Sequence, residues 1–292
     1  MNRIAVIGPG AIGATVAAWL CQVPANRVTV CARSPIERLT IDAPSGTLTA
    51  SPKIVLSPEA AEPVDWVLVA TKAYDVAGAA LWLPRLTGPH TRIAILQNGV
   101  EHRERFAGHA DPARLVPVIV DIPAQRRGPG HIWQRRDGTL TVADDAGGRA
   151  FAALFPAGGP RTVLVNDLRS QAWRKLALNA AGAVSAVVLK PAGIAKRPEI
   201  AAIMRDLARE CIAVGQAEGA VFEENLVETI VASYRDGPPD AMNSLHADRA
   251  AGRPIEIDAR NGAIVRIGRR HGIATPMNAT IVALLEAAAA EV

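Results

Sequence analysis

The sequence has few of the features that mark secreted, membrane-spanning or disulfide-rich proteins. Its 292 residues include only three cysteines, an odd number with no C-x-x-C spacing, which predicts reduced thiols rather than a disulfide framework. No uninterrupted apolar run is long enough to span a bilayer. The first residues show no basic segment followed by an apolar one, so no secretory signal is expected. These absences favour a cytoplasmic protein without a membrane partner.

Concentrated charge of one sign is also lacking. The 32 Lys and Arg are interleaved with 28 Asp and Glu, and the net charge is only +4. A nucleic-acid-binding domain usually carries a basic patch or stripe, so nucleic acid is not an expected partner, whereas an anionic small molecule suits the mild positive balance. The six histidines show no metal-ligand spacing, and no metal is expected.

The first half of the chain alternates short apolar runs with helical stretches. A content of 49% hydrophobic residues is enough for a large core. Continuous apolar strands of this kind predict a parallel sheet that is covered on both faces. The predicted strands are RIAVIG (3–8), RVTVCA (27–32), DWVLVATK (65–72), TRIAILQNG (91–99) and RLVPVIVDI (114–122). Between residues 128 and 142 shorter β-like pieces predict an antiparallel extension of the same domain.

From about residue 167 the strand signal disappears and helical periodicity continues to the end. Apolar residues recur at three- and four-residue steps, and they predict a helix that ends near Gly219. These residues are Ile200, Ile203, Leu207, Cys211 and Val214. Further helices are expected within 223–237, 256–272 and 278–292. The predicted fold is therefore an α/β Rossmann-like N-terminal domain, residues 1–166, followed by an all-α C-terminal domain, residues 167–292.

A glycine motif follows the first predicted strand directly and opens the first predicted helix. In that context Gly8 permits a tight turn, Gly10 lets the backbone approach a pyrophosphate, and Gly13 lets helix and strand pack closely. The helix N-terminus offers unpaired N–H groups to the anion. The motif predicts a dinucleotide cradle, although a plain strand-to-helix turn is the alternative. Its residues are Gly8, Pro9, Gly10, Ala11, Ile12 and Gly13.

The end of the second predicted strand indicates which dinucleotide is bound. An acidic residue there would hydrogen-bond the adenosine ribose of NAD, but the stretch VTVCARSP contains no Asp or Glu. Arg33 stands in this stretch, and an arginine can bind a 2′-phosphate with charge-assisted hydrogen bonds. The sequence therefore predicts NADP (NADPH), unless Arg33 is an ordinary surface arginine.

Three further stretches place polar residues where a ligand would bind. ATKAYD and LQNGV put Lys72 and Asn98 just beyond two predicted strands, at the edge where open α/β sheets bind ligands. WRKLALNAAG puts Lys175 and Asn179 four residues apart on one helix face. Taken singly, each lysine could be solvated or ion-paired, and Asn-Gly is a common turn.

Taken in order, these stretches and NSLHADRAAGRPIEIDARNG (243–262) resemble the ketopantoate reductase (2-dehydropantoate 2-reductase) family over essentially the whole chain. The segments that distinguish this family from other dehydrogenases are W-x-K-L-x-x-N and E-I-D-x-x-N-G. The resemblance implies a Rossmann domain, a helical domain like that of 6-phosphogluconate dehydrogenases, and an active site between them. It also implies an NADP-dependent oxidoreductase that converts a branched 2-oxo acid into a 2-hydroxy acid, with ketopantoate to pantoate in pantothenate biosynthesis as the leading reaction.

The resemblance also implies a role for each matched residue. Lys175 becomes the catalytic lysine, because an ammonium can stabilise the charge that develops on a ketone oxygen and can deliver a proton. The implied substrate-binding residues are Asn98, Asn179, Ser244 and Glu256, and the implied cofactor contacts outside the glycine motif are Arg33, Lys72 and Asn98.

Three positions depart from the family pattern. Ala183, Ala241 and Ala247 stand where the family carries amide side chains, so hydrogen bonds to the substrate could be missing. A related 2-oxo acid or opine-type dehydrogenase is therefore an alternative, as is a non-catalytic dinucleotide-binding regulator. The retained Lys175 and Glu256 argue against the regulator. A homodimer is one assembly that the sequence leaves open.

Overall fold

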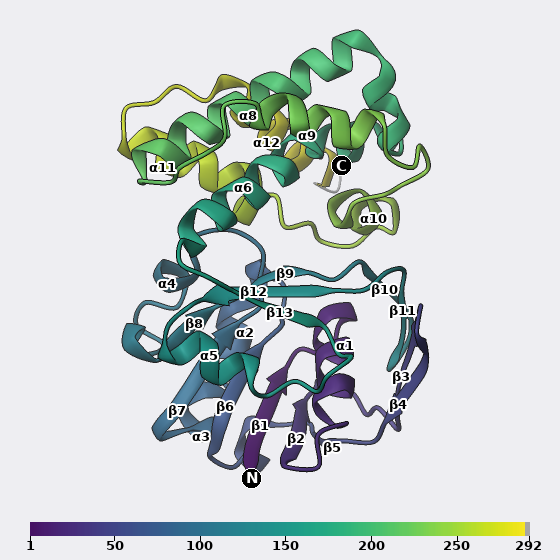
Figure 1. Ribbon diagram of the computed structural model, residues 1–292, viewed down its shortest axis with the longest axis vertical. Coiled ribbons are helices and arrows are strands. Elements are labelled where there is room, and N and C mark those ends of the chain that lie inside the picture. Colours follow the sequence, from purple (N-terminus) through teal and green to yellow (C-terminus); the bar gives the residue numbers. More distant parts are fainter. Residues whose placement is uncertain (290–292) are drawn as a thin grey trace. The chain divides into compact units, whose positions relative to one another are not determined.

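The computed structural model describes residues 1–289 and forms two compact units (Figure 1). The first unit comprises Met1–Asn98 and His102–Leu168, and the second comprises Gly99–Glu101 and the chain from Arg169 onward. The last three residues of the predicted helix 278–292 lie outside the described residues. Within residues 1–289, no helix combines the length and apolar character that a membrane span requires.

The first unit is built on a six-stranded sheet in which every neighbouring pair is parallel. The strand order is β5 (Lys53–Val55), β2 (Asn26–Cys31), β1 (Asn2–Ile7), β6 (Val64–Val69), β7 (Thr87–Ile95) and β8 (Leu115–Pro117). From β1 the chain first adds strands toward one edge of the sheet, β2 and then β5. It later adds β6, β7 and β8 toward the other edge. This arrangement creates a switch point at β1, where ligands of such sheets bind.

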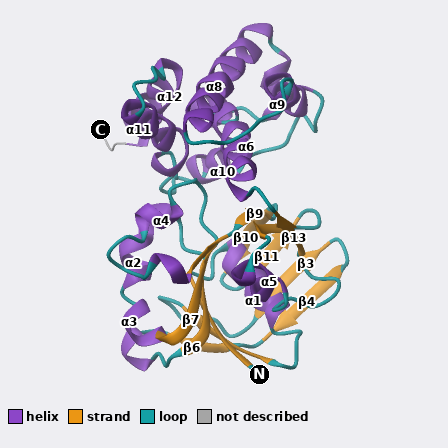
Figure 2. Ribbon diagram, turned by 60° about the vertical axis from the view of Figure 1, so that its left-hand side comes forward, coloured by secondary structure: helices purple, strands orange, loops and turns teal. Residues whose placement is uncertain are grey.

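Both faces of this sheet are buried, which explains why its strands read as continuous apolar runs. Ile4 and Val6 pack with α1 (Ala11–Leu20) in one apolar cluster. Ala5 and Ile7 point to the other face and pack with residues from α2 (Val76–Ala80), α3 (Leu83–Leu86) and the region of α4 (His102–Arg105). Figure 2 shows α1 and α2 on opposite sides of the strands.

Two smaller sheets complete the first unit. One has the order β10 (Ala124–Gly128), β11 (His131–Gln134), β3 (Leu39–Ala43), β4 (Gly46–Ala50). The other has the order β13 (Arg161–Val165), β12 (Thr139–Ala143), β9 (Ile119–Asp121). The remaining short elements are α5 (Ala146–Ala152), η1 (Pro58–Ala60), η2 (Ala73–Asp75) and η3 (Pro112–Arg114).

These small sheets correct the predicted antiparallel extension. Antiparallel pairs are present, but β11 also runs parallel to β3, and β12 runs parallel to β13. The predicted strand 114–122 is two strands in different sheets, β8 and β9, which separate around Val118 after Pro117. Proline cannot donate a ladder hydrogen bond, which is consistent with pairing being interrupted there.

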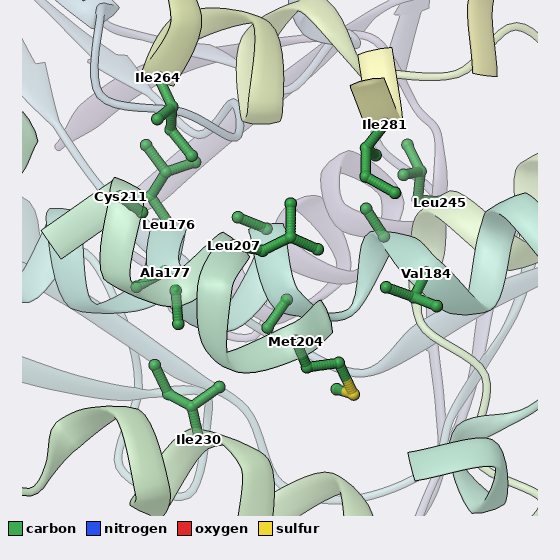
Figure 3. Packing of buried hydrophobic residues seen from close by; sticks show 14 of the residues in the cluster. Leu176, Ala177, Val184, Met204, Leu207, Cys211, Ile230, Leu245, Ile264 and Ile281 are labelled. Carbon is green, nitrogen blue, oxygen red and sulfur yellow. The ribbon is translucent and has the colours of Figure 1, made fainter. Parts of the chain in front are cut away.

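The second unit is helical. Its helices are α6 (Leu168–Ala181), α7 (Ala183–Val188), α8 (Pro198–Ala217), α9 (Leu226–Arg235), α10 (Ser244–Ala250), α11 (Ala263–Arg270) and α12 (Pro276–Ala289), with a 3₁₀ turn η4 (Ala192–Lys196) and a π-helical turn η5 (Asp258–Gly262). The predicted stripe on α8 points into the core, where Leu207 and Cys211 pack with Leu176 of α6 and Ile264 of α11 (Figure 3). The predicted fold class is confirmed.

Candidate functional site: a glycine cradle and a polar helical cluster

The glycine motif forms a tight turn between β1 and α1 that other residues would not fit. Gly8 has φ +88°, and a Cβ on it would lie 2.8 Å from Thr71 Cγ2. A Cβ on Gly13 would lie 2.1 Å from the carbonyl oxygen of Gly8. Gly10 differs, because its φ is −70° and a Cβ there would meet no protein atom within 4 Å. Gly8 and Gly13 are therefore required for packing, whereas Gly10 faces open space.

The N-terminus of α1 has the free donors that an anion needs. Gly10 occupies the capping position without a side-chain cap, and no acidic residue lies in the first turn. The amide of Ala14 donates to Gly10 O (2.9 Å), so the N–H groups of Ala11, Ile12 and Gly13 precede the helical ladder. Such donors, together with the positive end of the helix dipole, make an anion-binding site.

The carboxyl ends of the central strands lie level with this turn. Backbone hydrogen bonds of the sheet continue just beyond the strand ends. They run from Gly8 N to Cys31 O (3.2 Å), from Ala70 N to Ile7 O (2.9 Å) and from Leu96 N to Val69 O (2.8 Å). Lys72 follows β6 and Asn98 follows β7, as the sequence predicts, so both begin from the ligand-binding edge of the sheet.

Gln97 joins the loops that follow β6 and β7. It is buried, and its Nε2 donates to Thr71 Oγ1 (3.0 Å) and to Lys72 O (3.2 Å). The main-chain carbonyl oxygen of Gln97 lies 2.9 Å from His102 Nε2. Gln97 is not among the predicted site residues, although its place next to Asn98 at a strand end is a usable signal.

Arg33 stands just after β2, where the sequence predicts the group that selects NADP. Its side chain is 86% exposed, and its guanidinium forms an ion pair with the carboxylate of Asp75 at the end of η2. Residues 28–35 contain no acid, but folding supplies one from forty-two positions along the chain. This acid is not predicted from the sequence, because no local pattern connects the two segments.

The helical unit holds the other predicted residues. Lys175 and Asn179 are half-buried on α6, Ser244 is exposed at the first turn of α10, and Glu256 is buried just before η5. Asn243 links these elements: its Nδ2 donates to Gly182 O (2.8 Å), and its Oδ1 caps α10 by accepting from His246 N (3.0 Å). The join between α6 and α7 is thereby tied to the start of α10.

Comparisons with known proteins match both halves of the chain. Residues 4–147 match the family "Ketopantoate reductase PanE/ApbA", and residues 167–289 match its C-terminal counterpart. A 2-dehydropantoate 2-reductase of Caulobacter vibrioides is 56% identical over 99% of this chain and 100% of the relative. The chain belongs to the ketopantoate reductase family. A Mycobacterium tuberculosis member is 36% identical over 98% of this chain and 97% of its own length.

Solved structures of the family share the whole fold. A 2-dehydropantoate 2-reductase from Geobacter metallireducens has a TM-score of 0.90 at 25% identity and covers 98% of this chain and 99% of its own. A family member from Ralstonia eutropha has a TM-score of 0.89 at 29% identity, with 98% of each chain covered. A D-mandelate dehydrogenase has a TM-score of 0.88 at 21% identity, a likeness of fold alone.

Arg260 is a buried charged residue of the helical unit that is not among the predicted site residues. Arg260 is only 1% exposed, and its Nη2 donates a hydrogen bond to Asn179 O. The negative charges of Glu256 and Asp248 lie near its guanidinium and stabilise the charged form. Burial lowers the pKa of this guanidinium, and the nearby Tyr234, Glu256 and Asp248 oppose that shift. In the E-I-D-x-x-N-G segment, Arg260 lies four residues after Glu256, and this spacing was a usable signal.

The same segment also has a structural function. Asn261 is fully buried, and its Nδ2 donates to Asn278 Oδ1 (2.9 Å) and Ala180 O (3.3 Å). Glu210 accepts from the amides of Met277 (2.8 Å) and Asn278 (2.9 Å), and so caps α12. The Asn of this motif therefore links η5 to α6 and α12.

The three family departures lie in different environments. Ala183 is fully buried within the apolar core of the helical unit. Ala241 contributes backbone bonds, accepting from Ala192 N (2.9 Å), and Ala247 is half-buried on α10. None of the three carries a polar side chain, so none can donate or accept a side-chain hydrogen bond.

Proposed function

We propose that the protein reduces 2-dehydropantoate (ketopantoate) to pantoate with NADPH as reductant. The observation that carries this proposal is the 56% identity to a 2-dehydropantoate 2-reductase over 99% of the chain. Residues 1–166 form the dinucleotide-binding domain and residues 167–292 the substrate domain. The reaction belongs to pantothenate biosynthesis, and the partner is a small 2-oxo acid in the cytoplasm.

The glycine cradle fits a dinucleotide pyrophosphate. A Cβ at Gly10 would meet only open space, and the first-turn amides of α1 lack a capping side chain. Gly8, Pro9, Gly10, Ala11, Ile12 and Gly13 hold the pyrophosphate, while Arg33, Lys72 and Asn98 contact the rest of the nucleotide. When bound, the nicotinamide supplies the hydride. NADPH is the proposed form because Arg33 can pair with a 2′-phosphate.

Lys175 is the proposed catalytic residue. Reduction of a ketone builds negative charge on its oxygen, which an ammonium stabilises and then protonates. Asn179 shares the helix face of Lys175 and, with Asn98, orients the substrate. Ser244 donates to a substrate carboxylate or hydroxyl, and the carboxylate of Glu256 accepts from a substrate hydroxyl.

A second candidate is the reduction of a related 2-oxo acid. It is favoured by Ala183, Ala241 and Ala247, which remove amide groups from the expected pattern. A site with fewer polar partners discriminates less strongly against a substrate that lacks a hydroxyl.

A substrate panel tests the proposal. NADPH consumption is followed with ketopantoate, with other 2-oxo acids, and with pyruvate plus an amino acid to detect opine formation. Turnover of ketopantoate with pantoate as product is expected. Turnover restricted to another 2-oxo acid favours the second candidate, and nucleotide binding without turnover of any compound would identify a regulator.

We also propose a homodimer. A ketopantoate reductase from Staphylococcus aureus, described as dimeric, is 28% identical to this chain with a TM-score of 0.86. Light scattering of the purified protein should give a mass near twice the 30.7 kDa of the chain, and a mass near that of one chain would refute the dimer.

A further inference from the structure

The ion pair between Arg33 and Asp75 lies at the position from which the sequence predicts nucleotide selection. The Arg33 side chain is 86% exposed, whereas that of Asp75 is only 22% exposed. Asp75 occupies the capping position of α2, and a Cβ on Gly78 would lie 2.2 Å from Asp75 Oδ1. The mostly buried carboxylate therefore lies against Gly78, and its ion-pair partner is an arginine whose side chain is largely in solvent.

Arg33 has two possible anionic partners in this arrangement. One is the 2′-phosphate of NADPH, which the proposed function assigns to it, and the other is the carboxylate of Asp75. A guanidinium binds carboxylate and phosphate with the same donor geometry, so the two anions compete for the same N–H groups. A phosphate that binds beside Asp75 also meets a like charge, which disfavours it. NADH has no 2′-phosphate and leaves the ion pair intact.

We propose that Asp75 is a specificity-determining residue that competes with the 2′-phosphate for Arg33 and so limits the preference for NADPH over NADH. This inference rests on the proposed dinucleotide binding, but not on the identity of the 2-oxo acid. It also predicts a sign: removal of the Asp75 charge increases the preference for NADPH. If Asp75 instead served to orient Arg33 for the phosphate, its removal would decrease that preference.

The test is the affinity of the purified full-length protein for each nucleotide without any 2-oxo acid. Nicotinamide fluorescence gives the Kd of NADPH and of NADH for the wild type and for Asp75→Asn. We expect NADPH to bind up to about fivefold more tightly to the variant, because one competing, solvent-exposed ion pair is lost, while the Kd of NADH stays nearly unchanged. Asp75→Ser, a second uncharged variant, should likewise tighten NADPH binding and leave the Kd of NADH nearly unchanged.

Two controls separate this mechanism from a general effect of charge. Asp65→Asn breaks the ion pair between Asp65 and Arg3 (3.1 Å) at the other end of the sheet, and it should leave both affinities unchanged. In an Arg33→Ala background, Asp75→Asn should lose most of its effect on NADPH, because the competition requires the guanidinium.

Three results would overturn the inference: weaker NADPH binding by Asp75→Asn, an equal change for both nucleotides, or an undiminished gain in the Arg33→Ala background. A wild-type protein that binds neither nucleotide would refute the proposed function together with this inference. A protein that binds both nucleotides tightly but reduces no ketopantoate would refute only the proposed substrate.

Discussion

Alanine substitutions at Gly13 and Gly10 separate the structural and ligand-binding functions of the glycine motif. At Gly13 the new methyl would lie 2.1 Å from Gly8 O and 3.1 Å from Ala70 Cβ. Neither neighbour is the end of a flexible side chain, so the β1–α1 turn must move. At Gly10 the methyl would meet no protein atom within 4 Å, and φ −70° with ψ −165° is a conformation that alanine adopts readily.

The expected magnitudes follow from these contacts. Overpacking of this kind costs about 1–3 kcal/mol. For a unit of this size, that loss lowers Tm by about 2–12 °C, at about 2–4 °C for each kcal/mol. Gly10→Ala should leave Tm unchanged or raise it by a few degrees, because a strain-free Gly→Ala change stabilises by about 0.4–1 kcal/mol through the unfolded chain.

Calorimetry and nucleotide titration together check this prediction. Gly10→Ala should keep its Tm and bind NADPH at least roughly tenfold more weakly, because its methyl enters the space that the pyrophosphate needs. Gly13→Ala should lose stability as well as affinity. A Gly10→Ala protein with wild-type affinity would refute the cradle and leave only a strand-to-helix turn.

Three further changes have expected outcomes. Lys175→Ala should lower kcat at least roughly a hundredfold and leave the Kd of NADPH nearly unchanged. Steady-state kinetics and nucleotide titration measure the two quantities, and normal turnover would mean that another group donates the proton. Glu210→Ala removes the carboxylate that caps α12 and should lower the free energy of unfolding by about 1–3 kcal/mol. Urea titration measures this change, and an unchanged midpoint would contradict the capping function. Partial burial raises the pKa of the Cys21 thiol from 9.0 to about 11. A thiol reagent at neutral pH should therefore modify Cys21 roughly a hundredfold more slowly in the folded protein than in urea, and equal rates would contradict the raised pKa.

The sequence predicts the central sheet and the helices of the second unit because their apolar periodicity is strong and local. Both faces of β1 are buried, as its continuous apolar run predicts, and Leu207 and Cys211 face the helical core, as their spacing predicts. The short strands β3, β4 and β13 escape such reasoning, because half-exposed segments of five residues carry little periodicity.

The candidate site shows the same division. The glycine motif and the W-x-K-L-x-x-N segment are contiguous, so sequence alone is enough to single out Gly10, Lys175 and Asn179 as candidates. Contacts of Arg33 and Asn179 come from distant segments. Asp75 meets Arg33 from forty-two residues away, and Arg260 reaches Asn179 O from eighty-one residues away. Such pairs depend on how the chain folds, and no local spacing predicts them.

The most direct test of the proposed function compares kcat/KM for ketopantoate and for 2-oxoisovalerate, which has the same carbon frame without the hydroxymethyl group. The assay uses saturating NADPH and the wild-type protein. If Ser244 and Glu256 bind the distal hydroxyl, ketopantoate should have the higher kcat/KM, by about tenfold or more, because a hydrogen bond to a charged group contributes about 1.5–3 kcal/mol. A higher kcat/KM for 2-oxoisovalerate, or no reduction of ketopantoate, would contradict the account.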